Sequence, residues 1–574
     1  MTSEEHHAPF RMPDRLFDEL GTGGGSKEAV FFLERAERSR RLLLLRTLLD
    51  RLDSLPTPLS PAAEAWSVLK AAAERAPEAV DRLLLAPATG GWIAHVLRRL
   101  HGTATGPPLW AEAGRLSALA VAASLHAGTR AELLVPLLDG AVHFPGLGTA
   151  RLGDVQPGAT VGRAEADQGR LSLSWPVPDA VGTPGRRAVF DCRPGSATAG
   201  DEPAAGDGKA CWTPLRTLTH GGPPGLAAIP LDDLDPYRDL DEPAPPARLD
   251  ADEAAAWQDL FGAAVGILSG AGDDAGPGRL DPAVIRSVVP WGRTTLAPPP
   301  PPDVRVSASS GDSYGAMLIT RPGSALALAE TLVHEFQHSK LAALLHLFRL
   351  VDDDREERFY APWRADPRHL TGLLHGAYAF TGVAGFWRDR LAEPAHADIA
   401  AYHFALRRLQ SRLVVRTLLA SARLTAAGHR LVTGLARTLD DWLREPVDRA
   451  ALARARTAAA LHRTEWRLRN VAAPADPRAP ERAALRFRAD RRFWPDTRTH
   501  AFATRPVDPR TPDDHLAAGD PATALDGYER ALARDPADAR ARSGWIVARA
   551  ALNPGPSTRR LLARPELFQP QRGG

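Results

Sequence analysis

The sequence predicts an α+β protein that is predominantly α-helical. Three observations predict this class: long stretches with apolar residues at helical spacing, a middle region of short alternating segments separated by glycine and proline, and small residues at helix-contact spacing near the C-terminus. The chain has 574 residues, enough for two or three domains, and 44% hydrophobic residues, enough to bury a core. We therefore expect a helical core, a strand-rich insertion and a tetratricopeptide-like C-terminal tail.

Residues 1–132 are predicted to form an N-terminal helical part. Its helices are expected over residues 27–52, 61–85, 92–100 and 111–127. Residues 133–250 are predicted to form the strand-rich insertion, in which residues 230–250 act as a loop or linker. Its strands are expected near residues 141–144, 159–162, 171–175 and 187–190. His143 and His220 lie in this insertion, and we expect both to be structural.

Residues 251–475 are predicted to form the helical core of the protein. It begins with a helix over 252–270, and helical spacing returns from 324 to about 470, interrupted by a polar loop and Asp366-Pro367. Between these helices, the five prolines of residues 298–302 suggest a stiff connector, and residues 303–310 are expected to form a strand. Residues 476–574 are predicted to hold a linker and tetratricopeptide-like helices. A single repeat is too short to form an array, so an ordinary packed hairpin is an equal alternative.

The segment Thr331-Leu-Val-His-Glu-Phe-Gln-His338 contains an HExxH motif inside one of these helices. His334 and His338 are four residues apart, so they share a helix face and can bind one divalent metal. Glu335 is placed to reach the open side of that metal or to form a hydrogen bond with a group that binds it. Ser324 is the expected N-cap of this helix. Lys340 follows the motif, and we expect its side chain either to be exposed or to pair with a carboxylate of the site.

The third metal ligand decides between classes of metal enzyme. Leu341 and Leu344 stand where the metzincin proteases need glycine and histidine, which excludes that class. Glu356 or Glu357 would give a gluzincin-like site, but both lie in a charged run that is typical of a solvated loop. His375, in a segment with helical spacing, is the better third ligand, and His346 is off the ligand face. Three histidines suit zinc and non-haem iron alike.

Several blocks of sequence accompany the HExxH motif in order. They are His7-Ala-Pro-Phe-Arg-Met-Pro-Asp14, Ser313-Tyr-Gly-Ala316, Leu332-Val-His-Glu-Phe-Gln-His-Ser-Lys-Leu341, Tyr360-Ala-Pro-Trp-Arg-Ala-Asp-Pro-Arg368 and Gly372-Leu-Leu-His-Gly-Ala-Tyr-Ala-Phe380. With these blocks, roughly residues 6 to 450 resemble the HExxH-motif domain family of actinobacteria. That family is regarded as iron(II)- and 2-oxoglutarate-dependent peptide β-hydroxylases that act on ribosomally made peptides.

The resemblance implies a dioxygenase that uses iron(II), 2-oxoglutarate and O2 to hydroxylate the β-carbon of a side chain in a ribosomally synthesised precursor peptide. His334, His338 and His375 would hold the iron, and Glu335 would orient a ligand or water. Arg364 or Arg368 would bind the distal carboxylate of 2-oxoglutarate, since a guanidinium matches a carboxylate in shape and charge. The hydroxyl groups of Ser310, Ser313 and Tyr314 would contact cofactor or substrate. The alternatives are a zinc hydrolase in which Glu335 is the general base, and a non-catalytic peptide-binding scaffold.

Composition limits the partners and the compartment. The formal net charge is +2, which gives no polyelectrolyte signal for nucleic acid, and no apolar run is long enough to span a membrane. Cys192 and Cys211 are the two cysteines, which excludes a disulfide framework and is typical of a reducing cytoplasm. The N-terminal segment lacks the pattern of a signal peptide, so we expect a cytoplasmic protein.

Overall fold

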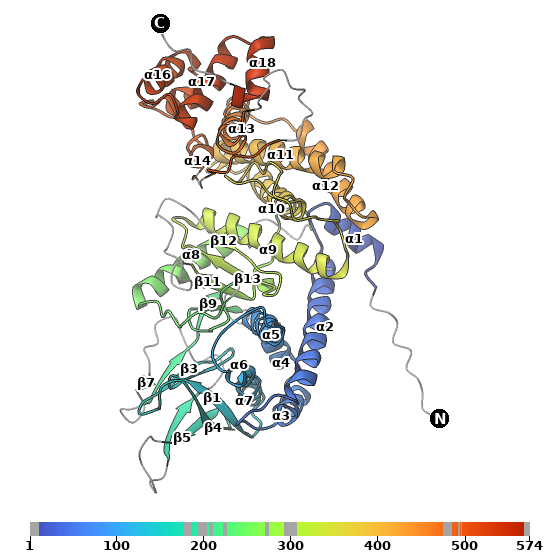
Figure 1. Ribbon diagram of the computed structural model, residues 1–574, viewed down its shortest axis with the longest axis vertical. Helices are drawn as coiled ribbons and strands as arrows, with labels where there is room; N and C mark the ends of the chain where they lie inside the picture. Colours follow the sequence, from blue (N-terminus) through green and yellow to red (C-terminus); the bar gives the residue numbers. More distant parts are fainter. Residues whose placement is uncertain are drawn as a thin grey trace. The chain divides into compact units, whose positions relative to one another are not determined.

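The computed structural model describes residues 11–176, 185–192, 204–205, 210–221, 227–240, 242–269, 275–291, 307–473, 485–491, 494 and 496–567. The protein is α+β and rich in helix, as the sequence predicts (Figure 1). The predicted proline connector of residues 298–302, residues 303–306 of the predicted strand, and residues 7–10 of the N-terminal sequence block lie outside the described residues.

The chain divides into two compact units. The first unit comprises Met1–Ala29, Asp273–Arg279 and Phe348–Gly574, and the second comprises Val30–Gly272 and Leu280–Leu347. This division differs from the boundaries expected at residues 132, 250 and 475. The N-terminal helices and the strand-rich insertion share one unit with the HExxH helix, and the expected core of residues 251–475 is divided after Leu347.

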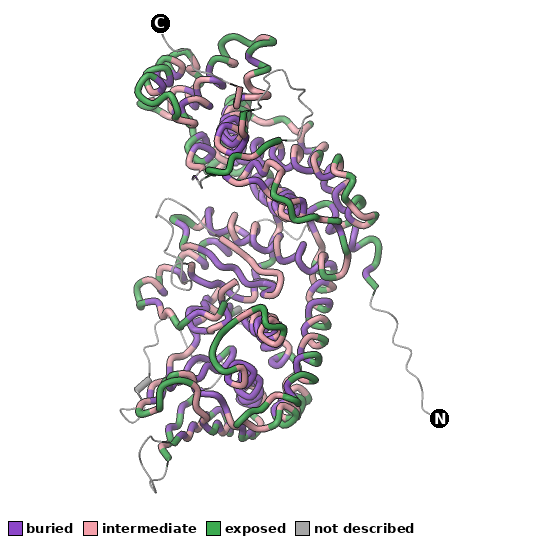
Figure 2. Tube along the Cα trace, in the orientation of Figure 1, coloured by how far each residue is buried: buried purple, intermediate pink, exposed green. Residues whose placement is uncertain are grey.

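The N-terminal helices follow the predicted pattern, with two additional breaks. They are α2 (Lys27–Leu52), α3 (Ala62–Arg75), α4 (Pro77–Leu85), α5 (Pro87–Leu100), α6 (Leu109–Ala113) and α7 (Arg115–Ala127). The helix expected over 61–85 breaks at Ala76, whose φ of −140° is extended, because a residue that precedes proline is sterically excluded from helical geometry. The helix expected over 111–127 breaks at Gly114, which caps α7. Helix α7 is buried from Arg115 to Leu125 and forms the centre of this part of the second unit (Figure 2).

The strand-rich insertion forms an eight-stranded sheet in the order β6-β5-β4-β1-β2-β3-β8-β7, with every neighbouring pair antiparallel. Its strands are β1 (Ala131–Leu138), β2 (Ala141–Phe144), β3 (Gly148–Leu152), β4 (Ala159–Asp167), β5 (Arg170–Trp175), β6 (Arg186–Asp191), β7 (Ala204–Ala205) and β8 (Ala210–Pro214). Alternate residues of β5 are buried, because successive side chains of a strand point to opposite faces. These inward residues share one hydrophobic core with α3, α4 and α7.

A second, five-stranded sheet supports the HExxH helix. Its order is β12-β13-β11-β10-β9, in which β11 is parallel to both β10 and β13, and β12 is antiparallel to β13. The strands are β9 (Arg216–His220), β10 (Ala227–Leu231), β11 (Ser287–Pro290), β12 (Ser307–Ala308) and β13 (Ala316–Ile319). Helix α9 (Ala325–Leu347) packs on β12, β13 and α8 (Ala251–Ser269) (Figure 1).

The segment after β10, predicted to be a loop or linker, is a packed loop. Asp233 is fully buried, accepts a hydrogen bond from the Leu249 N–H at 2.9 Å and pairs with Arg248 at 3.2 Å. Asp235 binds the Arg115 guanidinium at 2.5 Å and lies 3.1 Å from His143 Nε2. The structural role expected for His143 is therefore supported by its contacts.

The first unit is an assembly of helices built from both ends of the chain. It contains α1 (Asp14–Gly21), α10 (Leu370–Asp389), α11 (Ala397–Ala420), α12 (Ala426–Arg444) and α13 (Arg449–Asn470). Arg430 on α12 joins α1 to this assembly, since its guanidinium binds Asp14 and Asp18 at 2.7 Å each. Helix α11 packs against α10, α12 and α13.

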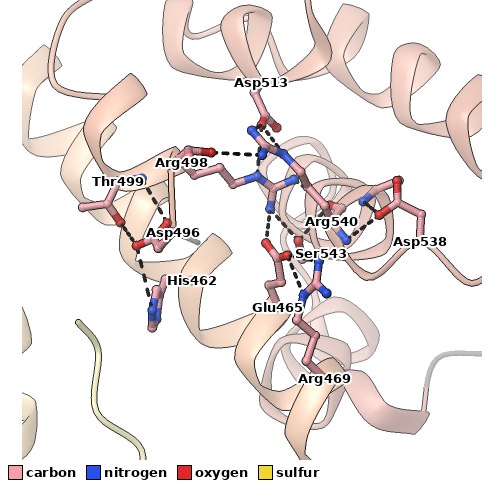
Figure 3. Close-up of polar contacts among 12 residues, drawn as sticks. His462, Glu465, Arg469, Asp496, Arg498, Thr499, Asp513, Asp538, Arg540 and Ser543 are labelled. Carbon is pink, nitrogen blue, oxygen red and sulfur yellow. Dashed lines mark hydrogen bonds and ion pairs between the residues drawn. The ribbon is translucent and has the colours of Figure 1, made fainter. Parts of the chain in front are cut away.

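The C-terminal helices belong to the same unit and share its core. They are α14 (Arg498–Ala501), α15 (Pro512–Ala518), α16 (Pro521–Arg534), α17 (Ala539–Leu552) and α18 (Pro556–Ala563). The ring of Tyr528 on α16 packs on Gly544 of α17, where a methyl group would lie 2.2 Å from the ring. Arg498 is 2% exposed and donates hydrogen bonds to Asp513 at 3.0 Å and Glu465 at 3.2 Å (Figure 3). These contacts make the tail a packed part of the first unit.

The described structure also bears on the two cysteines and on membrane-spanning helices. Cys192 and Cys211 are both free thiols, and burial raises the pKa of Cys192 to about 12, so this thiol stays protonated at neutral pH. Of the helices in the described segments, none combines the length and the apolar character that crossing a membrane requires.

Candidate metal centre

The helix that carries the HExxH motif begins where the sequence predicts. The Ser324 hydroxyl accepts a hydrogen bond from the Ala327 N–H at 3.3 Å and so acts as the N-cap. Leu328 and Leu332 are fully buried on the side of α9 that packs into the second unit. The helix ends at Leu347.

The three polar residues of the motif form one cluster on α9. The Nε2 atoms of His334 and His338 are 3.1 Å apart, and the planes of the two rings are at 82°. Glu335 Oε1 lies 3.9 Å from His334 Nε2. Within the described part of the chain, this is the one group of three potential ligand residues whose ligand atoms all lie within 4.8 Å of one another.

The spacing of the two histidine nitrogens fits a shared metal ion. Two imidazole nitrogens bound to one ion at about 2.1 Å, with bonds about 90–110° apart, are separated by about 3.0–3.4 Å. The observed 3.1 Å falls within that range. Both histidines are half-buried, whereas Glu335 is 1% exposed, so the histidine side of the cluster is the side that solvent reaches.

Glu335 faces the edge strand of the five-stranded sheet. The hydroxyls of Ser307 on β12 and of Ser309 just after it donate hydrogen bonds to its carboxylate. Burial raises the pKa of Glu335 to about 7, although these two hydrogen bonds partly offset the effect. No described residue donates a hydrogen bond to its Oε2 atom. Glu335 is therefore fixed by the sheet while one of its oxygens stays available.

Ser307 and Ser309 were not among the predicted site residues. The signal that could have found them was the expected strand over residues 303–310, in which residues 307 and 309 share one face. Lys340 was predicted to be either exposed or paired with a carboxylate. It is 3% exposed, and burial lowers its pKa to about 7, so the exposed alternative is wrong. The loss of solvent around the Lys340 ammonium is the cause of the lowered pKa.

The three hydroxyl residues predicted to contact cofactor or substrate lie in the loop that precedes β13. Ser310 Oγ accepts a hydrogen bond from the Asp312 N–H at 3.2 Å within this loop. Ser313 is buried beside Gly91 of α5. Tyr314 is also buried, and the loss of solvent and the nearby Glu34 raise its pKa. Ser313 and Tyr314 thus lie against the N-terminal helices of the second unit.

His346 and the acidic pair Glu356 and Glu357 were the weaker alternatives for a third ligand. His346 Nδ1 lies 2.6 Å from Glu37 Oε1, so this histidine has a carboxylate partner. Glu356 and Glu357 are exposed in an irregular segment of the first unit, as expected for a solvated loop. His346, Glu356 and Glu357 are not part of the α9 cluster.

His375, Arg364 and Arg368 belong to the first unit. His375 lies on α10, and burial, together with the nearby His369 and Arg368, lowers its pKa to about 4. Its imidazole is therefore neutral at pH 7, the form that binds metals. Arg364 is 47% exposed and donates to Asp366 at 2.8 Å. Arg368 is 28% exposed, lies 3.5 Å from the same carboxylate, and has an Nε atom that is buried with no hydrogen-bond partner among the described residues.

No protein-family model and no curated protein matches this chain.

Proposed function

We propose that the protein is an iron(II)- and 2-oxoglutarate-dependent dioxygenase that hydroxylates the β-carbon of a side chain in a ribosomally made peptide. The observation that carries the metal part of this proposal is the 3.1 Å separation of the His334 and His338 nitrogens on the accessible side of α9. The choice of iron and 2-oxoglutarate is supported by the ordered sequence blocks that accompany the motif. When bound, iron and 2-oxoglutarate would supply an oxidant strong enough to hydroxylate an unactivated carbon.

The residues of α9 would hold and orient the metal. His334 and His338 supply two neutral nitrogen ligands from a rigid helix, which leaves positions for a bidentate 2-oxo acid and for O2. Glu335 would orient a ligand or a water molecule, since the hydroxyls of Ser307 and Ser309 fix its carboxylate. A carboxylate fixed in this way suits an orienting role.

The third ligand in this proposal is His375. Its lowered pKa supports the assignment, because the imidazole carries no extra proton at neutral pH that a metal would have to displace. Of the two candidate arginines for the 2-oxoglutarate carboxylate, Arg368 is favoured, since Arg364 donates to Asp366 at 2.8 Å, whereas Arg368 is 3.5 Å from that carboxylate and its buried Nε has no hydrogen-bond partner among the described residues. Replacing His375 with alanine should abolish iron binding, whereas E356A and E357A should leave the metal content unchanged. Loss of metal from the glutamate variants alone would instead support the gluzincin-like arrangement.

The deciding experiment is anaerobic reconstitution with iron(II), followed by addition of 2-oxoglutarate. A metal-to-ligand charge-transfer band that appears only with both components supports the dioxygenase. Its absence, together with stoichiometric zinc and cleavage of a peptide, overturns the proposal.

A zinc hydrolase is the second candidate, and one observation favours it. Burial raises the pKa of Glu335 to about 7, and its Oε2 has no partner among the described residues, which suits a general base that takes a proton from metal-bound water. In that mechanism the two histidines would hold zinc, and Glu335 would be indispensable for turnover.

A further inference from the structure

Strand β12 lies at the edge of the five-stranded sheet, directly beside the candidate metal centre. Among the described residues, β13 is its one neighbouring strand, with Ser307 opposite Ile319 and Ala308 opposite Leu318. Its side chains reach the HExxH helix through Ser307 and Ser309, which donate hydrogen bonds to Glu335. The strand is therefore fixed on one side by β13 and on one face by α9.

The direction of the main-chain groups of β12 follows from the pairing of β13. Ile319 pairs with Pro290 of β11, and its C=O accepts a hydrogen bond from the Trp291 N–H at 2.8 Å. The N–H and C=O of one strand residue point to the same side, so Ile319 faces β11 and turns its main chain away from Ser307. The N–H and C=O of Ser307 therefore point to the outer edge of the sheet. Ser309 lies just after this two-residue strand, and its hydroxyl reaches Glu335 as the Ser307 hydroxyl does, so we extend the alternation of the strand to Ser309.

The side chains of His334 and His338 point beyond the same edge of the sheet. Successive residues of a helix are rotated by roughly 100° about its axis. Measured from His334, the side chain of His338 is therefore at roughly 40° around α9 and that of Glu335 at roughly 100°. Ser339, at roughly 140° on the same scale, accepts a hydrogen bond from Gly315 just before β13. Because Glu335 lies over the edge strand and Ser339 lies further over the sheet, the two histidines are directed beyond β12. Their partial exposure agrees with this direction.

We infer that an extended peptide binds as an added strand along the outer edge of β12, which brings one of its residues to the His334–His338 pair. An extended peptide is the occupant because the outward N–H and C=O of Ser307 are a donor and an acceptor on one strand residue, which an extended main chain can match in pairs. This inference rests on the proposed peptide-modifying function and specifies how the substrate is held. Recognition through the main chain tolerates different side chains next to the modified residue.

The experiment uses the full-length protein loaded with zinc(II) and two metal-chelating probes. The first probe is acetohydroxamate, and the second is a blocked alanine tripeptide that ends in the same hydroxamate group. The variant Ser307→Pro removes the outward N–H, while the ladder to β13 uses the main-chain groups of Ala308. Its matched control, Ser307→Ala, loses the same hydroxyl but keeps the N–H. Ser309→Pro and Ser309→Ala form a second pair, which keeps the test valid if one proline variant does not fold.

We expect the tripeptide hydroxamate to bind the wild-type protein and both alanine variants about tenfold or more tighter than acetohydroxamate, as two or three main-chain hydrogen bonds would give. The proline variants should lose most of this difference, while their zinc content and acetohydroxamate affinity equal those of the matched alanine variants, which lack the same hydroxyl. A tripeptide that gains nothing over acetohydroxamate, or that keeps its advantage in folded proline variants, would overturn the edge-strand inference alone. Failure of both probes with a zinc-free protein would overturn the metal site and this inference together.

Discussion

Glu335 of the HExxH helix and Ser307 of the edge strand are joined by a hydrogen bond in which the serine hydroxyl donates. This bond connects the candidate metal centre to the sheet that supports it. It also holds a carboxylate that is 1% exposed, so the role of Glu335 can be tested without disturbing the surface of the protein.

Replacing Glu335 with glutamine separates the two proposed reactions. Glutamine keeps the shape and still accepts the serine hydroxyls, but it cannot act as a base at neutral pH. A dioxygenase should retain its metal and should decarboxylate 2-oxoglutarate within about tenfold of the wild-type rate, whereas a hydrolase should lose more than about 1000-fold in turnover. Succinate formation and peptide cleavage, measured side by side, give the answer. Loss of metal in E335Q would contradict both roles and would make Glu335 a ligand.

Replacing His334 or His338 with alanine should weaken metal binding by more than about 100-fold, because each change removes one of the proposed ligands. The matched control is His346→Gln on the same helix, where glutamine can still donate a hydrogen bond to Glu37. Metal content after dialysis against a defined metal buffer is the measurement. Equal losses of metal in H334A and H346Q would indicate a folding defect and not a ligand role.

The stability of the second unit should fall in acid because of His126. Burial and the nearby Arg82 lower the pKa of this histidine to about 4, below its unfolded value of about 6.5. The unfolded chain thus binds a proton that the folded chain does not, so the stabilising contribution is complete above about pH 6.5 and is lost as the pH falls through 4. Wild type should lose on the order of 2–3 kcal/mol relative to His126→Gln between pH 7 and about pH 4.5. Denaturant unfolding of both proteins at the two pH values measures the difference, and parallel pH profiles would refute it.

Replacing Arg498 with methionine should destabilise the first unit by about 2–4 kcal/mol, because the carboxylates of Asp513 and Glu465 would lose their shared buried cation and would keep only Arg540 and Arg469 as partners (Figure 3). Arg510→Met is the control. Its pair with Asp508 is exposed on both sides, and such pairs contribute less than about 1 kcal/mol. Urea unfolding monitored by tryptophan fluorescence compares the two variants. Similar midpoints would mean that the buried network contributes no more than a surface pair.

Deleting residues 511–574 should damage the fold of the first unit and not simply its binding of substrate. The deletion removes Tyr528 and Leu516 from a core that also contains Tyr402, Leu461 and Phe502. Exposed apolar surface of this kind leads to aggregation or to binding of hydrophobic dyes. The soluble yield and the melting temperature are the measurements. A soluble truncated protein that melts at the wild-type temperature would contradict the shared core.

Local features of the fold and the site could be predicted from the sequence, since they depend on short-range patterns. The HExxH helix with its Ser324 cap, the bounds of α2 and the strand at residues 141–144 were predicted from spacing alone. The contacts of Glu335 with Ser307 and Ser309 were not, because they depend on which strand lies at the edge of the sheet. The burial of Lys340 also could not be predicted, since lysine is usually exposed and the sequence does not show which distant segments cover a helix face.

The division of the chain has a consequence for the order of its folding during synthesis. The second unit contains no residue beyond Leu347, so all of its parts are available before residues 348–574 have been made. The first unit, in contrast, pairs α1 with α12 through Arg430, across more than 400 residues of chain. The contact between α1 and α12 can therefore form only after α12 has been synthesised, whereas the HExxH helix and its sheet can assemble earlier. The half of the protein that carries the histidine pair is the half that can form first.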